Sequence, residues 1–500
     1  ATIFRLQPFQ DDRGVETTGI GKDDFLGRRH EAAPNVGYDG RADNGFYQWA
    51  QGKARGKRGG VARVLPMIGR ICHWTGWPHW CRPEGMSDFA EKARAAEAAM
   101  RTLFPATPLQ RNAYLSERYE ADIWLKREDL SPVRSYKIRG AFNAMRKVLE
   151  KDPTRSQFVC ASAGNHAQGV AFVCQHFGVK GVIFMPVTTP QQKIDKTRVF
   201  GGENVTIRLI GDYFDETLAA AQSYCSDEGA HFLSPFDDPD VIEGQASVAV
   251  EMLAQMPNLP DEVILPVGGG GLSSGVTSYF NAAGVKTHIS LVEPVGGPSL
   301  TAALEHGAPH TIAIKDTFVD GAAVARIGAK PFAILKSVKP EDVHLAPENR
   351  ICVTIQEMLN IEGVVLEPAG ALSIDVLRDL AESIKGKTVV CLTSGGNFDF
   401  ERLPEVKERG MRYQGLKKYF ILRMPQRPGA LKDFLGLLGP DDDIARFEYL
   451  KKSARNYGSV LIGIETRDEN HFPDLFARME ENGFAYRDIT DDEVLSEFLI

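Results

Sequence analysis

A run of four glycines, Gly268 to Gly271, lies between a strand-like apolar segment and a probable helix in "PVGGGGLSSG". Residues without side chains let successive backbone N–H groups turn toward one anion, beside the partial positive charge of a helix N-terminus. No Gly-Lys-Ser/Thr triplet follows, and the spacing is not that of a dinucleotide-binding turn. We therefore predict that Gly268, Gly269, Gly270 and Gly271 bind a phosphate group. The loop is neither a nucleotide P-loop nor a dinucleotide-binding turn.

A lysine, Lys137, lies behind Ser135 and Tyr136 in "SPVRSYKIRGAF", at the start of an apolar helical pattern. On general burial statistics a lysine is most often a solvated surface residue. Small and apolar neighbours also fit a buried amine, because burial favours the neutral, nucleophilic form. This fragment alone does not decide between the two interpretations.

Two further loops carry polar residues directly after strand-like runs. "SAGNHAQG" offers side-chain and backbone donors for a small carboxylate at a helix start, although a helix N-cap uses the same residue types. "LTSGGNF" presents the hydroxyl of Ser394. The candidate donors of the first loop are Ser162, Gly164, Asn165 and His166.

These residues together indicate pyridoxal phosphate as the cofactor. Lys137 would supply the Schiff base, the glycines would hold the phosphate, and the polar side chains would fix the ring. Each of these groups follows or precedes an apolar run, so a strand or a helix positions it.

Residues 86–412 alternate strand-like and helix-like segments, which is typical of an α/β domain with a mostly parallel sheet. In such sheets functional groups gather where strands end in loops, at the carboxyl edge. The expected strands lie at 156–162, 180–187, 204–210, 261–267, 287–295 and 387–396.

Residues 417–500 form a separate unit, with the order βαββαβ of a small ferredoxin-like sandwich. Its expected strands are 417–424, 444–450, 457–466 and 484–490. Its first helix, within 428–439, is expected to carry Leu431, Phe434, Leu435 and Leu438 on one face, and its second Phe472, Leu475, Phe476 and Met479.

Residues 1–85 differ from the rest of the chain, because periodicity is hard to find and "GKARGKRGG" is typical of a flexible basic linker. We expect a poorly ordered extension ahead of the functional protein. The group Cys72, His73, His79 and Cys81 matches no usual zinc-finger spacing, so no metal site is expected.

Composition excludes several classes of protein. The net charge of −8 argues against nucleic acid or an anionic membrane as the main partner, and no apolar run is long enough to span a bilayer. The 7 cysteines are scattered without framework spacing, which favours reduced thiols in a cytoplasmic protein.

The motifs "SYKIRGAF", "SAGNHAQGVA", "PVGGGGLSSG", "FVDGAAVARIG", "EPAGAL" and "TSGGNF" follow the order and approximate spacing of biosynthetic threonine dehydratases. These enzymes belong to the tryptophan-synthase-β-like group of pyridoxal phosphate enzymes, which has a two-subdomain α/β fold. The resemblance covers roughly residues 100–410. The C-terminal unit, with "RPGALKDFL", resembles the single ACT-like regulatory domain of the short form of these enzymes.

The resemblance implies a role for each candidate residue. Lys137 would form the Schiff base and remove the Cα proton, Asn165 would bind the ring hydroxyl, and Gly268 to Leu272 would hold the phosphate. Ser394 would face the pyridine nitrogen. A neutral hydroxyl there stabilises a delocalised carbanion less than an aspartate would, which favours β-elimination over racemisation or transamination.

The implied reaction converts L-threonine into 2-oxobutanoate and ammonia, the first step of isoleucine biosynthesis. The resemblance further implies inhibition by isoleucine, with valine as a second candidate effector, and a homotetramer in the cytoplasm.

Several alternatives stay open. L-serine dehydratase and serine racemase are the nearest, but racemase-like members carry a serine where this chain has Ala163, which has no proton to give. Cysteine and threonine synthases would share the fold, with less similar motifs around Lys137 and Asn165. From another class, the chain could be a non-catalytic amino-acid sensor.

Overall fold

The computed structural model describes residues 88–450 and 456–492. The extension predicted for residues 1–85, with its cysteines and histidines, lies outside the described residues, and the boundaries of the three predicted regions stay predictions. Among the helices of the two described ranges, none has the length together with the apolar character that a membrane crossing requires.

The larger sheet has six strands in the order β1-β2-β10-β7-β8-β9, and all of them except the antiparallel β1 run parallel. Every residue of β7 is buried, as expected for a central parallel strand with helices on both faces. The strands are β1 (Leu109–Arg111), β2 (Asp122–Arg127), β7 (Glu262–Pro266), β8 (His288–Pro294), β9 (Val343–Ala346) and β10 (Thr388–Thr393).

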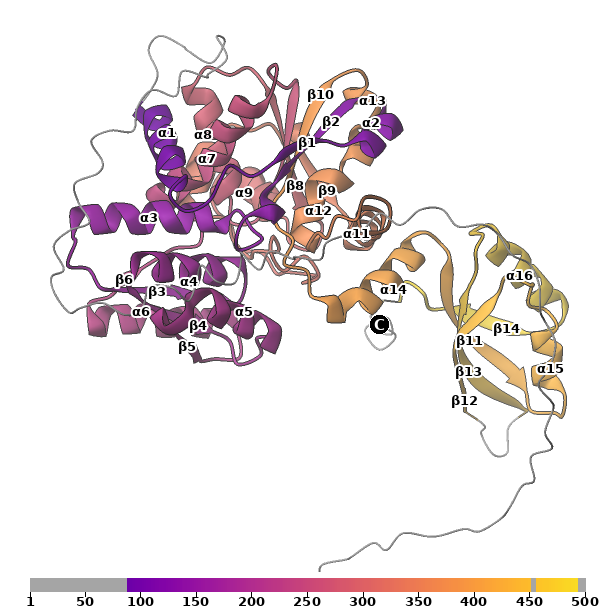
Figure 1. Ribbon diagram of the computed structural model, residues 1–500. Helices are drawn as coiled ribbons and strands as arrows, with labels where there is room; N and C mark the ends of the chain where they lie inside the picture. Colours follow the sequence, from indigo (N-terminus) through magenta and orange to yellow (C-terminus); the bar gives the residue numbers. More distant parts are fainter. Residues whose placement is uncertain (1–87, 451–455, 493–500) are drawn as a thin grey trace, which may run out of the picture. The chain divides into compact units, whose positions relative to one another are not determined.

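The smaller sheet has four parallel strands in the order β5-β4-β3-β6. Figure 1 shows these strands together with α4, α5 and α6, the helices that connect them. The elements are β3 (Gln157–Ala161), α4 (Asn165–Phe177), β4 (Lys180–Met185), α5 (Gln191–Gly201), β5 (Val205–Leu209), α6 (Phe214–Glu228) and β6 (His231–Phe232).

The predicted α/β architecture with mostly parallel strands is confirmed, although the strands form two sheets and not one, and each of the six predicted strand segments contains a strand. Helix α3 (Lys137–Lys151) packs on α4 of the smaller sheet and on α7, so it touches both halves. The other helices are α1 (Asp88–Met100), α2 (Ala113–Tyr119), α7 (Pro239–Gln255), α8 (Gly271–Ala282), α9 (Ser299–His306), α10 (Ala329–Leu335), α11 (Glu348–Glu362), α12 (Pro368–Asp375), α13 (Leu377–Ile384) and α14 (Leu403–Tyr413).

The C-terminal unit is an antiparallel sheet in the order β12-β13-β11-β14, with α15 and α16 on one face (Figure 1). This is the predicted ferredoxin-like order, and Val460, Ile462 and Ile464 alternate into its core, as expected. The elements are β11 (Lys417–Pro425), α15 (Ala430–Leu435), β12 (Asp443–Leu450), β13 (Tyr457–Glu465), α16 (His471–Glu481) and β14 (Ala485–Asp488).

One prediction in this unit was wrong. Helix α15 has only 6 residues, and it buries Ala430 and Phe434, whereas Leu431 and Leu435 are 41% and 42% exposed. Residues four apart share a helix face, and each neighbouring residue lies about 100° further round. The two leucines therefore form a second, exposed apolar face beside the buried one.

Candidate active site

Lys137 is the first residue of α3, at the end of a tightly held loop. The Ser131 hydroxyl lies 2.8 Å from both the N–H and the carbonyl oxygen of Ser135. Ser135 pairs with Gly395, and the N–H of Tyr136 donates to the carbonyl of Ser394 at 3.2 Å. The backbones that carry Lys137 and Ser394 are therefore neighbours, although 257 positions separate them in the sequence.

The Lys137 amine lies in largely apolar surroundings. Its Nζ donates to the carbonyl of Pro235 at 3.1 Å and lies 5.3 and 5.9 Å from the ring centres of Tyr136 and Phe236. Burial lowers the pKa of Lys137 to about 8, against the opposing effect of the Glu367 carboxylate. A sizeable fraction of neutral amine near physiological pH follows, which is what a nucleophile and base requires.

The four-glycine turn packs so closely that side chains would not fit. A Cβ added at Gly269 would overlap the Phe236 ring, and one at Gly268 would lie 3.0 Å from Ala322. Gly270 has φ +83°, a conformation that favours glycine. The turn leads into the N-terminus of α8, where the first N–H groups lack partners within the helix and the dipole favours an anion.

The start of α4 carries the second predicted loop. Asn165 donates from Nδ2 to Oε1 of Glu367 at 2.7 Å, and its Oδ1 accepts from Nδ2 of Asn397 at 2.7 Å. The N–H of Gly164 donates to the hydroxyl of Ser162 at 3.2 Å. Asn165 is thus held by Glu367 at the start of α12 and by Asn397 in the loop after β10.

His166 is turned into the interior. Its Nε2 lies 3.0 Å from the carbonyl of Leu233, and burial, with a smaller effect of Lys137, lowers the pKa of the imidazole to about 3. The ring is therefore neutral and donates to that carbonyl. Any contact of this residue with a substrate carboxylate would come from its backbone N–H.

Three residues of the site were not identified from the sequence. Glu367 is buried, and burial, reinforced by Asp320, raises its pKa to about 7. Asn397 joins Asn165 to the carbonyl of Val133. Phe236 joins the glycine turn to Lys137. "EPAGAL" and "TSGGNF" contain the first two, whereas Phe236 lies in a turn with no signal of its own.

Residues 101–395 match the family described as "Pyridoxal-phosphate dependent enzyme". The chain belongs to this family. Residues 408–499 match a second family, described as "C-terminal regulatory domain of Threonine dehydratase". The predicted cofactor is confirmed, and the regulatory unit is assigned to the family that its sequence pattern resembled.

Curated relatives match the chain over most of their own length. The chain is 48% identical over 395 residues to the biosynthetic L-threonine dehydratase of Bacillus subtilis (strain 168), covering 79% of this chain and 93% of the relative. It is 42% identical over 415 residues to the biosynthetic L-threonine dehydratase of Lactococcus lactis subsp. lactis (strain IL1403), covering 82% and 99%.

Solved structures agree on the fold. The processed form of threonine deaminase isoform 2 from Solanum lycopersicum aligns with TM-score 0.60 at 35% identity, covering 66% of this chain and 95% of that chain. A second solved threonine deaminase, from the organism abbreviated T.th., aligns with TM-score 0.57 at 30% identity, covering 62% and 98%. The predicted two-subdomain pyridoxal phosphate fold is confirmed.

The residues present fit this cofactor. A glycine turn that leaves no room for a Cβ at Gly269 or Gly270 and little at its other two positions, at a helix N-terminus, suits a phosphate group. A lysine with a lowered pKa suits covalent attachment of an aldehyde. The Ser394 hydroxyl is buried and lies 3.2 Å from the carbonyl of Ala369. It is a neutral group that can turn toward a ring nitrogen.

Proposed function

We propose that this pyridoxal phosphate enzyme is a threonine ammonia-lyase, which converts L-threonine into 2-oxobutanoate and ammonia at the first step of isoleucine biosynthesis. The observation that carries the proposal is the position of Lys137, whose backbone neighbours the Ser394 strand end and whose amine faces Phe236, the residue packed on the glycine turn. The names of the relatives that match over nearly their whole length support the choice of substrate.

Each group of the cofactor is assigned to residues of this chain. Lys137 attaches it, the N–H groups of Gly268 to Leu272 bind the phosphate, Asn165 binds the ring hydroxyl, and Ser394 lies at the ring nitrogen. Bound pyridoxal phosphate supplies an electron sink for charge that develops at the substrate Cα.

The protein supplies the base and the orientation. A lysine pKa of about 8 places Lys137 close to the pH at which an amine can accept a Cα proton. We assign the substrate carboxylate to the start of α4, where the dipole favours an anion and where Ser162, Gly164, Asn165 and His166 provide donors. The Asn165–Glu367 and Asn165–Asn397 hydrogen bonds keep that loop in place.

Replacing Ser394 tests the assignment at the ring nitrogen. Ser394→Ala should bind cofactor about fivefold more weakly and eliminate more slowly, since loss of one hydrogen bond costs about 1 kcal/mol. Ser394→Asp should increase racemised or transaminated side products, because a carboxylate favours the protonated ring. Cofactor titration and product analysis measure both effects.

Ser373→Ala is the matched control, because Ser373 is equally buried and its hydroxyl donates to the carbonyl of Leu392 at 2.9 Å. If both Ser394 variants keep the wild-type cofactor affinity and product ratio, Ser394 does not face the ring nitrogen.

For the regulatory unit we propose isoleucine as the effector, with valine as a second candidate. A pocket of about 390 Å³ lies beside the Pro428–Gly429 turn, between α15 and β12. Lys432 brings positive charge to it, as does Arg427, which also pairs with Asp433 at 2.7 Å, and this charge suits a carboxylate. Leu431 and Leu435 bring apolar surface, which suits a branched side chain. The exposed leucine face of α15 would then contact the side chain of the effector.

The decisive experiment measures 2-oxo acid release from threonine and serine by the purified full-length chain, with and without isoleucine and valine. Both substrates are needed because a single methyl group is worth only about 1–3 kcal/mol in a pocket. Bound cofactor without any 2-oxo acid would favour the sensor alternative, and D-serine formation without 2-oxo acid would favour a racemase.

A further inference from the structure

Arg139 follows Lys137 by two positions on α3 and is completely buried. Its Nε and Nη2 donate to the two carboxylate oxygens of Glu128 at 2.7 and 2.8 Å. Its Nη1 and Nη2 donate to the two oxygens of Glu251 at 2.7 and 2.8 Å, and Nη1 also donates to Ser247 Oγ at 3.0 Å. All five N–H groups of the guanidinium therefore have acceptors.

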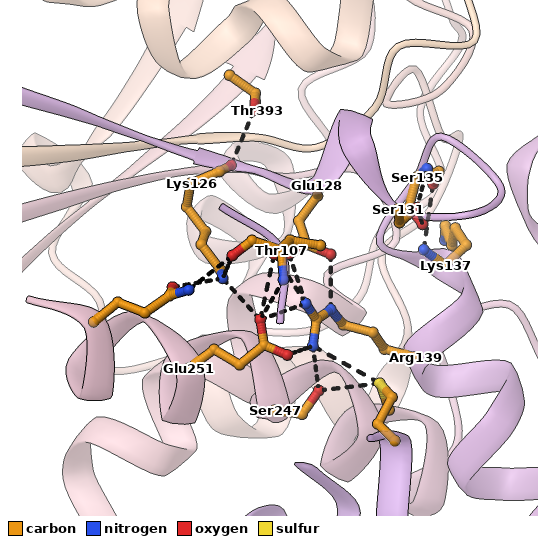
Figure 2. Close-up of polar contacts among 12 residues, drawn as sticks. Thr107, Lys126, Glu128, Ser131, Ser135, Lys137, Arg139, Ser247, Glu251 and Thr393 are labelled. Carbon is orange, nitrogen blue, oxygen red and sulfur yellow. Dashed lines mark hydrogen bonds and ion pairs between the residues drawn. The ribbon is translucent and has the colours of Figure 1, made fainter. Parts of the chain in front are cut away.

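Two further cations bind Glu251: the buried Lys126 and the partly exposed Arg101. Nζ of Lys126 donates to Glu251 at 2.7 Å, to the carbonyl of Thr107 at 2.7 Å and to Gln255 at 2.9 Å. Burial raises the pKa of Glu251, but the charges of Arg139 and Lys126 outweigh that effect and hold the pKa well below its ordinary value. The group, named here the Arg139 cluster, consists of Thr107, Lys126, Glu128, Arg139, Ser247, Glu251 and Gln255. Figure 2 labels all of them except Gln255.

The Arg139 cluster connects the elements that carry Lys137 and Ser394. Arg139 belongs to the same helix as Lys137. On the other side, the Thr393 hydroxyl lies 2.9 Å from the carbonyl of Lys126 and 2.7 Å from Asp129 (Figure 2 shows the first of these contacts). Lys137 therefore lies two positions from Arg139, a member of the cluster. Ser394 directly follows Thr393, which is hydrogen-bonded to the cluster.

Helix geometry separates the two side chains of α3. Residues two positions apart lie about 200° apart around a helix, so the side chains of Arg139 and Lys137 leave α3 on roughly opposite sides. A Cβ at Gly244 would lie 2.6 Å from the carbonyl of Arg139, and one at Gly169 would lie 3.2 Å from the carbonyl carbon of Lys137.

These glycine contacts keep α3 from moving sideways toward α7 or α4. Rotation about the helix axis and sliding along it remain. Four charge-assisted bonds from one rigid, planar guanidinium to two other elements oppose both movements, because bidentate pairs are directional. An ammonium group at the same position could not hold two carboxylates in this way.

We propose that Arg139 is a positioning residue: its bonds to Glu128 and Glu251 set the direction in which Lys137 leaves α3 and its spacing from Ser394. The proposal rests on the roles assigned above to Lys137 and Ser394. It adds a residue that touches neither substrate nor cofactor and acts through the helix.

Arg139→Lys tests this in the holoenzyme, because it keeps the charge and loses the planar fork. We expect kcat per bound cofactor to fall roughly 100-fold, as for misplacement of a reacting group by about 1 Å, with the KM for threonine changed less than about threefold. The visible circular dichroism of the bound cofactor should change, because it reports the orientation of the ring.

Arg350→Lys is the matched control. Arg350 on α11 is 8% exposed and binds Asp375 at 2.8 Å and Asp379 at 2.7 Å, in a cluster that contacts neither Lys137 nor Ser394. It should lose comparable thermal stability while its cofactor keeps the wild-type circular dichroism and its kcat stays within about threefold. Equal losses of kcat in the two variants would overturn the proposal, as would an unchanged signal in Arg139→Lys.

Should Arg139→Lys not fold, Glu128→Gln provides the same test with a smaller change. We expect about a tenfold lower kcat and an altered cofactor signal, and a wild-type signal would overturn the proposal. The circular dichroism needs only bound cofactor. It therefore still tests the role of Arg139 if the wild-type chain releases no 2-oxo acid from threonine. That result would contradict the proposed function and not the positioning role.

Discussion

Lys137→Ala is expected to abolish release of 2-oxo acid from threonine and to remove the visible absorbance of attached cofactor. A positioned base contributes about 10²–10⁴-fold to the rate, and here the same amine also attaches the cofactor, so the loss should exceed that range. Lys137→Arg should be as inactive, because a guanidinium stays protonated and cannot act as an amine. Absorbance spectra and 2-oxo acid assays measure both variants.

Lys151→Ala controls for the loss of a lysine from the same helix, since Lys151 is exposed near the end of α3. A second amine near the site must also be tested. Burial lowers the pKa of Lys196 on α5, although Glu367 opposes that effect. If Lys137→Ala keeps its absorbance and turnover while Lys196→Ala loses both, the cofactor is attached to Lys196 and the assignment of Lys137 is wrong.

The strands and loops of this site could be predicted because their signals are local. A run such as "DEVILPV" ends in four glycines, and both the apolar pattern and the turn lie within a dozen residues. The glycine turn after β7 and Ser394 after β10 then converge, because parallel strands present their carboxyl ends at one edge of a sheet. The motif resemblance added the roles of those residues.

The partners of these residues could not be predicted, because they come from distant segments. Asn165 meets Glu367 across 202 positions and Asn397 across 232. Arg139 likewise meets Glu251 across 112 positions, and nothing near "KIRGAF" distinguishes a buried arginine from a surface one. Such contacts depend on how whole elements pack, which periodicity does not encode.

Helix α15 shows a related limit. Four apolar residues at helical spacing predicted one buried face, yet Leu431 and Leu435 line the pocket that we assign to the effector. A pattern of hydrophobic residues identifies surfaces that avoid water, and it does not distinguish a core contact from a ligand contact.

Truncation after residue 412 is expected to leave an active enzyme whose threonine saturation no longer responds to isoleucine. Helix α14 should stay in place, because Arg409 binds Asp316 at 2.7 Å and Gln356 donates to the carbonyl of Val406 at 3.3 Å, all before the cut. In the full-length chain isoleucine should shift half-saturation by about 5–150-fold, the usual range of allosteric coupling.

A point variant in the full-length chain separates loss of the effector site from loss of the whole unit. Leu435→Asp places a carboxylate in the pocket beside α15, where it would repel the effector carboxylate and remove apolar contact. Isoleucine inhibits only if it binds two global states of the enzyme with different affinity. Weaker binding to both states should therefore abolish inhibition, while threonine turnover without isoleucine is unchanged.

Ala477→Asp is the control, at an exposed position of α16 outside the pocket, and this variant should still be inhibited by isoleucine. If isoleucine still inhibits the truncated chain and Leu435→Asp at the wild-type concentration, the effector binds elsewhere and the C-terminal unit serves another purpose, such as assembly of the oligomer.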